Sequence, residues 1–485
     1  MSNSKFNVKY CVLLPIVLAV TIFLWVVPTD FFGITGLTVT MQRTIAIFAF
    51  AALMWIFEIV PNWVTSLMVI VGALLTISNK SLKFAMNTGD DSIFMSSKEL
   101  MRSFADPVVM LFMGGFVLAI VASKYGMDVK LAKILLKPFG SKPKFVLLGF
   151  LVIIAVFSMF MSNTATAAMF LTFLAPVLAT LPDDEKGKVG LALSIPIAAN
   201  VGGIGTPIGT PPNATAVGIL ENNGMAVTFA EWAVRMIPFV IIMILIAWVI
   251  LQIFFPFKTK QIKIEIPQKD TKKTWRDYVA WITFGLTIIL WMTEQIHGLS
   301  SNIVALIPLV VYTATGVFTT EDIKEINWSV LWLVAGGFAL GYALNDTGLA
   351  KALVNSIDFG SMSIIVVFIV AGGICYFLSN FISNSATAAL LIPILIVVAT
   401  AMEDPSAASN AAFVSMGGTQ AMIIFVATCA SIAMLLPIST PPNAIAASTG
   451  MVETKDMAKV GIIIGIIGFV LGYFWLTKIF PFPLS

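Results

Sequence analysis

Apolar runs long enough to cross a lipid bilayer constrain this chain more than any other feature of its sequence. Examples are Tyr10–Val27, Thr44–Ile59, Phe239–Phe255 and Gly461–Leu476. A transmembrane helix needs roughly 20 apolar residues. Only 11% of the residues are charged, against roughly 25% in soluble domains. The sequence therefore predicts an all-α polytopic membrane protein, and the run that follows Lys5 and Lys9 is interpreted as its first helix, not as a cleaved signal.

The positions of lysine and arginine indicate how the chain is oriented. Lys124–Lys144 holds six lysines and one acidic residue, Asp128, whereas Lys258–Arg276 holds six lysines and Arg276. Both loops are short and lie between apolar runs, so we expect them in the cytoplasm and expect no nucleic acid partner. The segment Glu221–Glu231 contains neither lysine nor arginine and should face outward.

About eleven membrane-spanning helices are expected. They lie near 10–27, 42–59, 62–78, 107–124, 190–219, 232–256, 277–293, 300–317, 328–345, 411–449 and 457–479. Both basic loops share one side only if the further apolar stretches 145–181 and 362–401 do not cross, so each is predicted to be a re-entrant helical hairpin. The amino terminus is then cytoplasmic and the carboxyl terminus outside, in the plasma membrane of a bacterium. Lys80–Ala105 is interpreted as a polar surface connection.

Three sequence motifs occur twice, in the same order. The pairs are FMGGFVLA (Phe112–Ala119) and VAGGFALG (Val334–Gly341), MSNTATAAMF (Met161–Phe170) and ISNSATAALL (Ile382–Leu391), and IGTPPNATA (Ile208–Ala216) and ISTPPNAIA (Ile438–Ala446). Each half holds five spans and one hairpin. Because five is odd, the second copy should be inverted. Inverted repeats with interrupted helices at corresponding positions are the architecture of secondary transporters.

The Thr-Pro-Pro-Asn motifs should interrupt helices. Adjacent prolines remove two amide donors and disfavour the α conformation at the preceding residue, so we expect breaks near 205–213 and 438–443. A break at membrane depth is tolerated only where it is buried in protein or lines a watery cavity, and the same holds for hairpin tips at 162–164 and 383–385. We expect the two tips and two breaks to converge on one site. For any single motif, helix packing by small polar residues is the alternative.

The expected site is polar but uncharged. It offers hydroxyl, amide and backbone groups, and no Lys or Arg lies within the motifs. Such groups bind an anion through hydroxyls, amides and the amino ends of half-helices. Their oxygens also suit a hard cation such as sodium. Because two similar clusters suit a ligand with two similar ends, a small dicarboxylate is predicted, with co-bound sodium offsetting its charge.

These paired motifs resemble those of the divalent anion–sodium symporter family, within the ion-transporter superfamily, from about residue 40 to the end of the chain. The resemblance implies a homodimer, held together by scaffold domains, in which a transport domain carries both hairpins as an elevator. It implies substrates such as succinate, malate, fumarate or 2-oxoglutarate. The parts are 1–40 (amino-terminal helix), 41–144 (scaffold, first repeat), 145–257 (transport, first repeat), 258–276 (cytoplasmic basic linker), 277–360 (scaffold, second repeat) and 361–485 (transport, second repeat).

The resemblance also implies site residues. Substrate contacts are implied for Ser162, Asn163, Thr164, Thr210, Pro211, Ser383, Asn384, Ser385, Thr440 and Pro441. Sodium ligands are implied at Ser158, Ser162, Asn163 and backbone near Gly209, and at Ser379, Asn384 and backbone near Ser439. Departures from the family pattern occur at Asn380, Ile382 and Ser385. Sodium-coupled symport is favoured, and sodium-independent exchange of dicarboxylates stays open as the alternative.

Other classes of function find less support. A membrane-embedded enzyme needs a nucleophile, paired acids or a metal cluster at depth, and a channel more often uses a ring of subunits. No cofactor is expected apart from sodium as a coupling ion. His297, Glu58 and Glu294 are interpreted as belonging to helix ends at the membrane interface. Buried thiols are expected at Cys11, Cys375 and Cys429.

Overall fold

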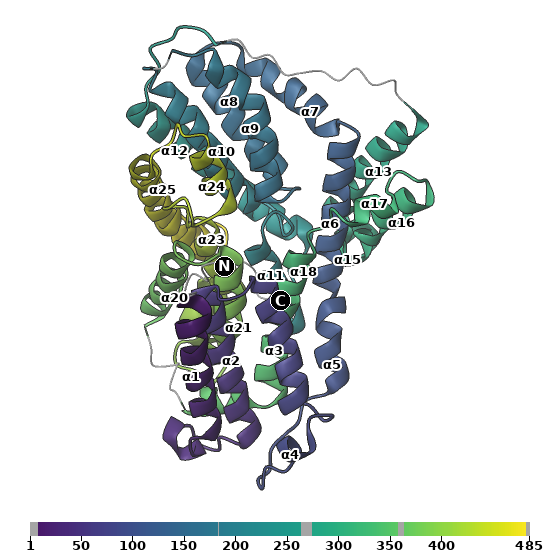
Figure 1. Cartoon of the computed structure of the whole chain (residues 1–485), viewed down its shortest axis with the longest axis vertical. Coiled ribbons are helices and arrows are strands. Elements are labelled where there is room, and N and C mark those ends of the chain that lie inside the picture. The colour runs from purple at the N-terminus through teal and green to yellow at the C-terminus, as the bar shows by residue number, and fades with distance from the viewer. Residues whose placement is uncertain (1–7, 183, 263–273, 357–362, 482–485) are drawn as a thin grey trace, which may run out of the picture.

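The computed structural model describes residues 8–182, 184–262, 274–356 and 363–481, and these segments form helices joined by turns and loops (Figure 1). The predicted all-α membrane fold is confirmed. Seven helices in the described segments are long and apolar enough to cross a membrane by length and composition. They are Lys9–Val26, Val39–Phe57, Ser97–Lys124, Phe229–Phe254, Trp328–Asp346, Asn384–Glu403 and Thr454–Ile479. Asn384–Glu403 is one arm of the second predicted hairpin, and the other six coincide with predicted spans.

The first half of the chain supplies the helices up to residue 254. They are α1 (Leu14–Val26), α2 (Val39–Phe57), α3 (Asn62–Thr76), α4 (Lys83–Met86), α5 (Ser97–Arg102), α6 (Pro107–Lys124), α7 (Met127–Leu136), α8 (Pro143–Ser158), α9 (Asn163–Ala179), α10 (Gly187–Gly203), α11 (Pro211–Asn222) and α12 (Phe229–Phe254). A π-helical turn, Lys9–Leu13, precedes α1, and 3-10 turns occur at Thr29–Phe32, Ser103–Ala105 and Lys137–Phe139.

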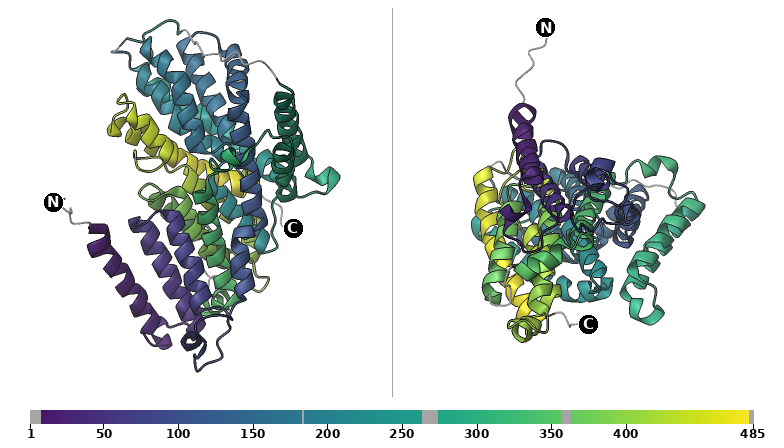
Figure 2. Two further views of the ribbon diagram at one scale, coloured as in Figure 1. Left: turned by 45° about the vertical axis from the view of Figure 1, so that its right-hand side comes forward. Right: turned by 90° about the horizontal axis from the view of Figure 1, so that it is seen from below.

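The second half of the chain supplies the remaining helices. Its helices are α13 (Trp275–Met292), α14 (Glu294–His297), α15 (Ser301–Val304), α16 (Leu306–Ala314), α17 (Thr320–Ile323), α18 (Trp328–Asp346), α19 (Leu349–Ser356), α20 (Ile364–Ser379), α21 (Asn384–Glu403), α22 (Asn410–Ser415), α23 (Gly418–Ser431), α24 (Pro441–Ser448) and α25 (Thr454–Phe474), with a π-helical end at Trp475–Ile479. Figure 2 shows α1–α3 and the group α13–α17 on different sides of the molecule.

Equivalent helices of the two halves run in opposite directions. At the start of α6, Asp106 caps the helix and accepts a hydrogen bond at 2.7 Å from Tyr342, near the end of α18. At the end of α6, Lys124 pairs at 2.5 Å with Asp322, which precedes α18. Because the two ends of α6 meet opposite ends of α18, the second repeat is inverted relative to the first, as predicted.

The repeated Gly-Gly motifs allow neighbouring helices to pack closely against α6 and α18. A Cβ at Gly114 would lie 2.2 Å from the carbonyl oxygen of Ala305, and one at Gly336 would lie 2.4 Å from Cβ of Ser66. Any larger residue would therefore force these helices apart, since real Cβ atoms do not approach so closely. The motif thus sets the spacing between α6 and α15–α16 in one half and between α18 and α3 in the other.

The two basic loops meet at one end of the molecule. The Ile262 amide donates to the Ser141 carbonyl at 2.8 Å, and Trp248 Nε1 donates to the Lys144 carbonyl at 2.7 Å. Lys263–Lys273, which include Lys272 and most lysines of the second loop, lie outside the described residues. The loop after α11 lies at the other end of α6, because Asn222 donates to Asp106 at 3.1 Å.

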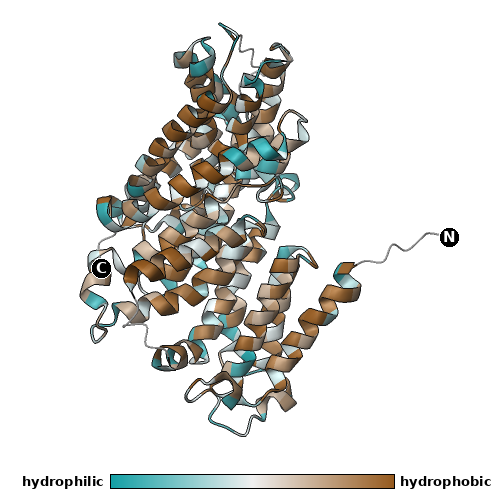
Figure 3. Cartoon of the chain, turned by 90° about the vertical axis from the view of Figure 1, so that its left-hand side faces the viewer, coloured by the Kyte–Doolittle hydropathy of each residue, from teal (hydrophilic) through white to brown (hydrophobic). Residues whose placement is uncertain are grey.

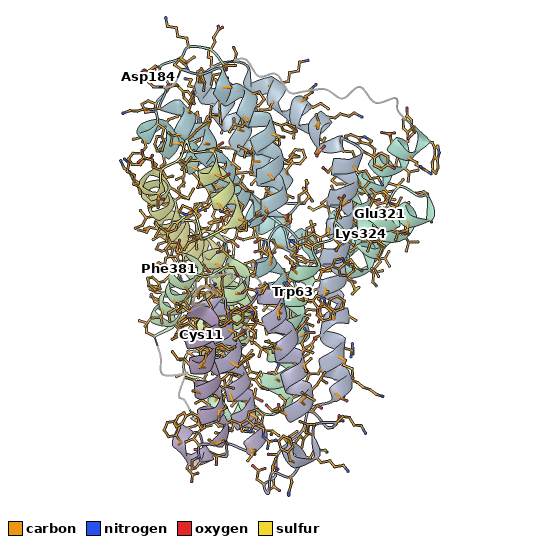
Figure 4. The ribbon with its side chains drawn as sticks, in the orientation of Figure 1. Cys11, Trp63, Asp184, Glu321, Lys324 and Phe381 are labelled. Carbon is orange, nitrogen blue, oxygen red and sulfur yellow. The ribbon has the colours of Figure 1, made fainter. Side chains whose placement is uncertain are left out.

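Glu185 fastens the loop after α12 to the amino end of α10. Its buried carboxylate accepts from the Lys258 amide at 3.0 Å and from the Thr259 amide and hydroxyl at 2.8 and 2.6 Å. Burial alone would raise the pKa of Glu185, but these hydrogen bonds outweigh it and hold the pKa below its ordinary value. Its neighbour Asp184, at the same end of the molecule in Figure 4, pairs with the Lys258 ammonium on the surface.

The outer surface of the helices is apolar. Figure 3 shows hydrophobic residues along the helices, with hydrophilic segments mainly near the two ends. Ile253 and Ile282 expose 68% and 67% of their surface. Exposed apolar faces of this extent require a partner, and the lipid of the predicted bilayer supplies it.

Two expectations about peripheral segments need correction. The stretch 80–105 is not only a connection, because it contains the short helices α4 and α5 and a 3-10 turn that ends just before the cap of α6 at Asp106. Cys11 is exposed, whereas Cys375 and Cys429 are buried free thiols as expected. The prediction for Cys11 was wrong because α1 packs mainly against α2 and leaves its other sides uncovered.

Candidate functional site

Each hairpin tip begins its second helix with a serine cap. Ser162 Oγ accepts from the Ala165 amide at 3.2 Å, and Ser383 Oγ accepts from the Ala386 amide at the same distance. Serine is a favoured N-cap because its oxygen satisfies an otherwise unpaired helix amide. The tips turn over residues 159–162 and 380–383, so Asn163 and Asn384 are the first helical residues. The predicted tips 162–164 and 383–385 therefore extend into α9 and α21, whose amino ends carry partial positive charge.

The first tip gathers oxygen atoms around the Asn163 amide. Its Nδ2 donates to Ser158 Oγ at 2.7 Å and to the carbonyl oxygens of Ala199 and Gly209 at 3.1 Å. One hydroxyl oxygen and two carbonyl oxygens therefore converge on this amide. Oxygen groups of this kind are the ligands that a hard cation prefers.

Three of the four residues predicted for the first ion are brought together in this cluster. Ser158, Asn163 and Gly209 meet there, while Ser162 Oγ is directed to the amino end of α9. Gly209 has no room for a side chain, because a Cβ would lie 2.3 Å from the Gly203 carbonyl oxygen.

The two helix breaks are held by the asparagines of the Thr-Pro-Pro-Asn motifs. Asn213 Nδ2 donates to the carbonyls of Gly203 and Thr206 at 3.0 and 2.8 Å. Asn443 Nδ2 donates to the carbonyls of Met434 and Leu436 at 2.9 and 2.8 Å. Gly203 is the last residue of α10, and the other three carbonyls lie within the breaks, where no helix continues to supply a partner. The sequence identified the prolines, which begin α11 and α24, but not this role of the asparagines.

Each break is tied to its own hairpin tip. Thr206 Oγ1 donates to the Met159 carbonyl in the first half. In the second half Ser439 Oγ donates to the Asn380 carbonyl at 2.8 Å, and Asn380 Oδ1 accepts from the Leu435 amide at 2.9 Å. The departure at Asn380 therefore supplies a structural bond that its counterpart Met159 cannot form.

The second tip leaves two of its predicted ligand oxygens unpaired. Ser379 Oγ and Asn384 Oδ1 are buried and have no hydrogen-bond partner among the described residues. A buried polar atom without a partner costs free energy, so these oxygens are available to a ligand. The Ser439 hydroxyl is not unpaired, since it donates to the Asn380 carbonyl.

Asn200 on α10 links the two halves across the site. Its Oδ1 lies 3.4 Å from the side-chain amide of Asn163, and its Nδ2 donates to Thr440 Oγ1 at 3.1 Å. The first tip therefore meets the second break, whereas no hydrogen bond in the described segments joins the two tips. Sequence reasoning missed Asn200 because the corresponding position of the second half is Ala430. A single asparagine within an apolar helix was the available signal.

The remaining predicted substrate residues differ in accessibility. Thr164 is exposed and Ser385 is half-buried, while Thr210 and Thr440 are buried at the starts of α11 and α24. Pro211 and Pro441 occupy the first helical positions, where proline is well tolerated. Four helix amino ends therefore border the site.

The other polar residues singled out by the sequence lie at helix ends. His297 Nε2 lies 2.9 Å from the Leu290 carbonyl oxygen, and its Nδ1 accepts from the Leu299 amide at 3.0 Å. Glu58 ends α2 in a left-handed conformation with φ of 45°, and Glu294 begins α14. These positions fit the expected role at the ends of spans.

Comparisons with known proteins agree with this architecture. A protein-family model described as citrate transporter matches residues 52–418. An uncharacterized transporter of Haemophilus influenzae is 32% identical, over 89% of this chain and 91% of the relative. The sodium-dependent dicarboxylate transporter SdcS of Staphylococcus saprophyticus is 26% identical, over 97% of this chain and 92% of the relative. The solved YdaH transporter of Alcanivorax borkumensis has a similar fold, with a TM-score of 0.52 and 15% identity over 79% of this chain and 88% of that chain.

Proposed function

Because the chain belongs to the citrate transporter family, we propose that it carries small dicarboxylates across the membrane together with sodium. Its membership confirms the resemblance drawn from the paired motifs, and a relative is named for sodium-dependent dicarboxylate transport. The proposed substrates are succinate, malate, fumarate and 2-oxoglutarate. Citrate, named by the family description, has a third carboxylate that the two tips do not match.

The observation that carries the proposal is the oxygen cluster at the first tip. The carbonyl oxygens of Ala199 and Gly209 and the hydroxyl of Ser158 lie within 3.1 Å of the Asn163 amide. A sodium ion takes these oxygens as ligands, together with Asn163 Oδ1 once the amide rotates toward the ion. The bound ion then places a positive charge beside the substrate, in motifs that contain no Lys or Arg.

The substrate is proposed to bind between the tips. The amino ends of α9 and α21 point their free amides and partial positive charge toward it. Ser162, Asn163 and Thr164 contact one carboxylate, and Ser383, Asn384 and Ser385 contact the other. Thr210, Pro211, Thr440 and Pro441 complete the walls. A second sodium is proposed at Ser379 and Asn384, whose oxygens are unpaired, with the backbone near Ser439.

The proposed movement follows the division into scaffold and transport parts. Both hairpins, with α10–α12 and α23–α25, move as an elevator against the scaffold helices of a homodimer. The basic loops face the cytoplasm, the amino terminus lies inside and the carboxyl terminus lies outside.

A second candidate function is exchange of dicarboxylates without sodium. It is favoured by the second half, where the Ser439 hydroxyl is committed to Asn380 at 2.8 Å and is not free to bind an ion. In an exchanger only the loaded transport part crosses the membrane.

Proteoliposomes distinguish the two candidates. Vesicles that are empty, or preloaded with succinate, are given labelled succinate with a sodium or a potassium gradient. Symport predicts sodium-dependent net uptake into empty vesicles. Uptake that occurs only with internal dicarboxylate, and is unchanged when potassium replaces sodium, establishes exchange and refutes sodium coupling.

A further inference from the structure

A side chain from the scaffold part contacts the second hairpin tip. Asn62, at the start of α3, donates from Nδ2 to Ser383 Oγ at 2.9 Å. Its backbone is fixed in place, since its carbonyl accepts from Trp55 Nε1 at 3.1 Å. Asn62 Oδ1 is buried and has no partner among the described residues. The tip is therefore not built from the transport part alone.

This contact determines what Ser383 offers to a ligand. A hydroxyl accepts up to two hydrogen bonds and donates one. Ser383 Oγ accepts from the Ala386 amide and from Asn62, so both acceptor positions are used and its proton is left to donate. A serine whose proton is free in this way can donate a hydrogen bond to a carboxylate oxygen.

The first tip lacks the equivalent bond. Among the residues that the structure describes, Ser162 Oγ accepts only from the Ala165 amide. The matching turn of the second half is built alike, because Trp291 Nε1 donates to the Ser301 carbonyl at 3.0 Å. However, Asn302 in that turn donates to Glu221 at 3.1 Å and not to a tip. The two tips thus differ in how their serines are oriented.

We propose that Asn62 is a positioning residue that orients the Ser383 hydroxyl to donate to a substrate carboxylate. This inference rests on the proposed dicarboxylate transport. Since Asn62 and Ser383 belong to different parts of the proposed elevator, the contact is made only when the transport part lies as it does here. Asn62 therefore raises substrate affinity in one state of the transport cycle.

Equilibrium binding of labelled succinate to the purified full-length protein in sodium tests the proposal. Asn62→Ala removes one hydrogen bond and should weaken binding about 2- to 12-fold. Asn62→Asp should weaken it more, because the carboxylate accepts the Ser383 proton and repels the dianion. A purely structural role predicts the opposite order, since Asp has the same shape as Asn. Asn302→Ala is the matched control and should leave affinity unchanged.

A double-mutant cycle with Ser383→Ala completes the test, and thermal unfolding verifies that each variant is folded. In the Ser383→Ala background, Asn62→Ala should have no further effect on binding. Additive losses, or Asn62→Asp binding at least as well as Asn62→Ala, would overturn the inference. If wild-type protein binds neither succinate nor another dicarboxylate, the proposed function itself fails, and the Asn62 inference fails with it.

Discussion

Gly209→Ala tests whether the first cluster binds the coupling ion. The added Cβ would lie 2.3 Å from the Gly203 carbonyl oxygen and 2.9 Å from other Gly203 atoms. These are backbone atoms, so they cannot rotate away as a flexible side chain would. The chain between α10 and α11 must shift, and the Gly209 carbonyl, which lies 3.1 Å from the Asn163 side-chain amide, must move with it.

The size of the effect follows from overpacking. Forcing an extra methyl group into a packed site costs about 1–3 kcal/mol. If this cost falls on the ion-bound form, sodium affinity drops by about 5- to 140-fold. Succinate uptake at saturating sodium should be affected less than the half-saturating sodium concentration.

The assay is the sodium dependence of succinate uptake in proteoliposomes. Gly72→Ala on α3 is the control, because no atom lies within 4 Å of the added Cβ and a helical Gly→Ala change is otherwise neutral or stabilising. A folded Gly209→Ala variant with an unchanged sodium requirement would show that the Gly209 carbonyl is not an ion ligand.

Three further predictions concern the tips, the topology and the basic end. Asn163→Ala and Asn384→Ala should each abolish succinate uptake without unfolding the protein. Each change removes an amide that contacts the ligand, and leaving its buried partners without a hydrogen bond costs about 1–3 kcal/mol. Wild-type uptake by both variants would place the site elsewhere. On intact cells an impermeant thiol reagent should label Asn410→Cys and spare Lys130→Cys, and the reverse pattern would invert the topology. In the folded protein Glu185 has a lowered pKa. Its contribution to the free energy of unfolding is therefore fully present above its unfolded pKa of about 4.3, and it is lost as the pH falls through the folded pKa. Thermal unfolding should show that Glu185→Gln lowers stability at neutral pH but not below both pKa values, and an equal loss at both would contradict this linkage.

Much of the helical framework could be predicted because it depends on local sequence. Length of apolar run, paired prolines and serine caps act within a few residues. The starts of α9 and α21 at Asn163 and Asn384 fall within the predicted tips 162–164 and 383–385. Inversion of the second repeat also followed, since it depends only on an odd number of spans.

The second break shows where local reasoning fails. It begins after Ser431, well before the predicted 438–443. Pro437 disfavours the α conformation at Leu436 only, so it does not explain why residues 432–435 leave the helix. The backbone amides of Leu435 and Leu436 donate to side chains: Leu435 to Asn380 Oδ1 at 2.9 Å and Leu436 to Ser439 Oγ at 3.0 Å. These hydrogen bonds form because the second tip lies beside the break. For the same reason, the links made by Asn62 and Asn200 across the molecule had no local signature.

The inverted repeat gives the halves one framework but different chemistry at equal positions. In the first half, the carbonyls of Ala199 and Gly209 both face the Asn163 amide. In the second half, Ser439 occupies the position of the glycine, and its hydroxyl donates to the Asn380 carbonyl. Ser379 and Asn384 therefore supply the unpaired side-chain oxygens of that cluster. The ion proposed for this cluster would therefore have fewer ligands and bind more weakly.

Unequal ion sites have a kinetic consequence that can be measured. If the first cluster binds sodium much more tightly, succinate uptake should rise hyperbolically with sodium at low concentration, because one ion then limits loading. The second ion contributes only at higher sodium, after the second tip has received its substrate carboxylate and the negative charge beside Ser379 and Asn384 has increased. A sodium dependence that is sigmoidal from the lowest concentrations would mean that both clusters fill together, and the chemical asymmetry of the two halves would then not set the order of binding.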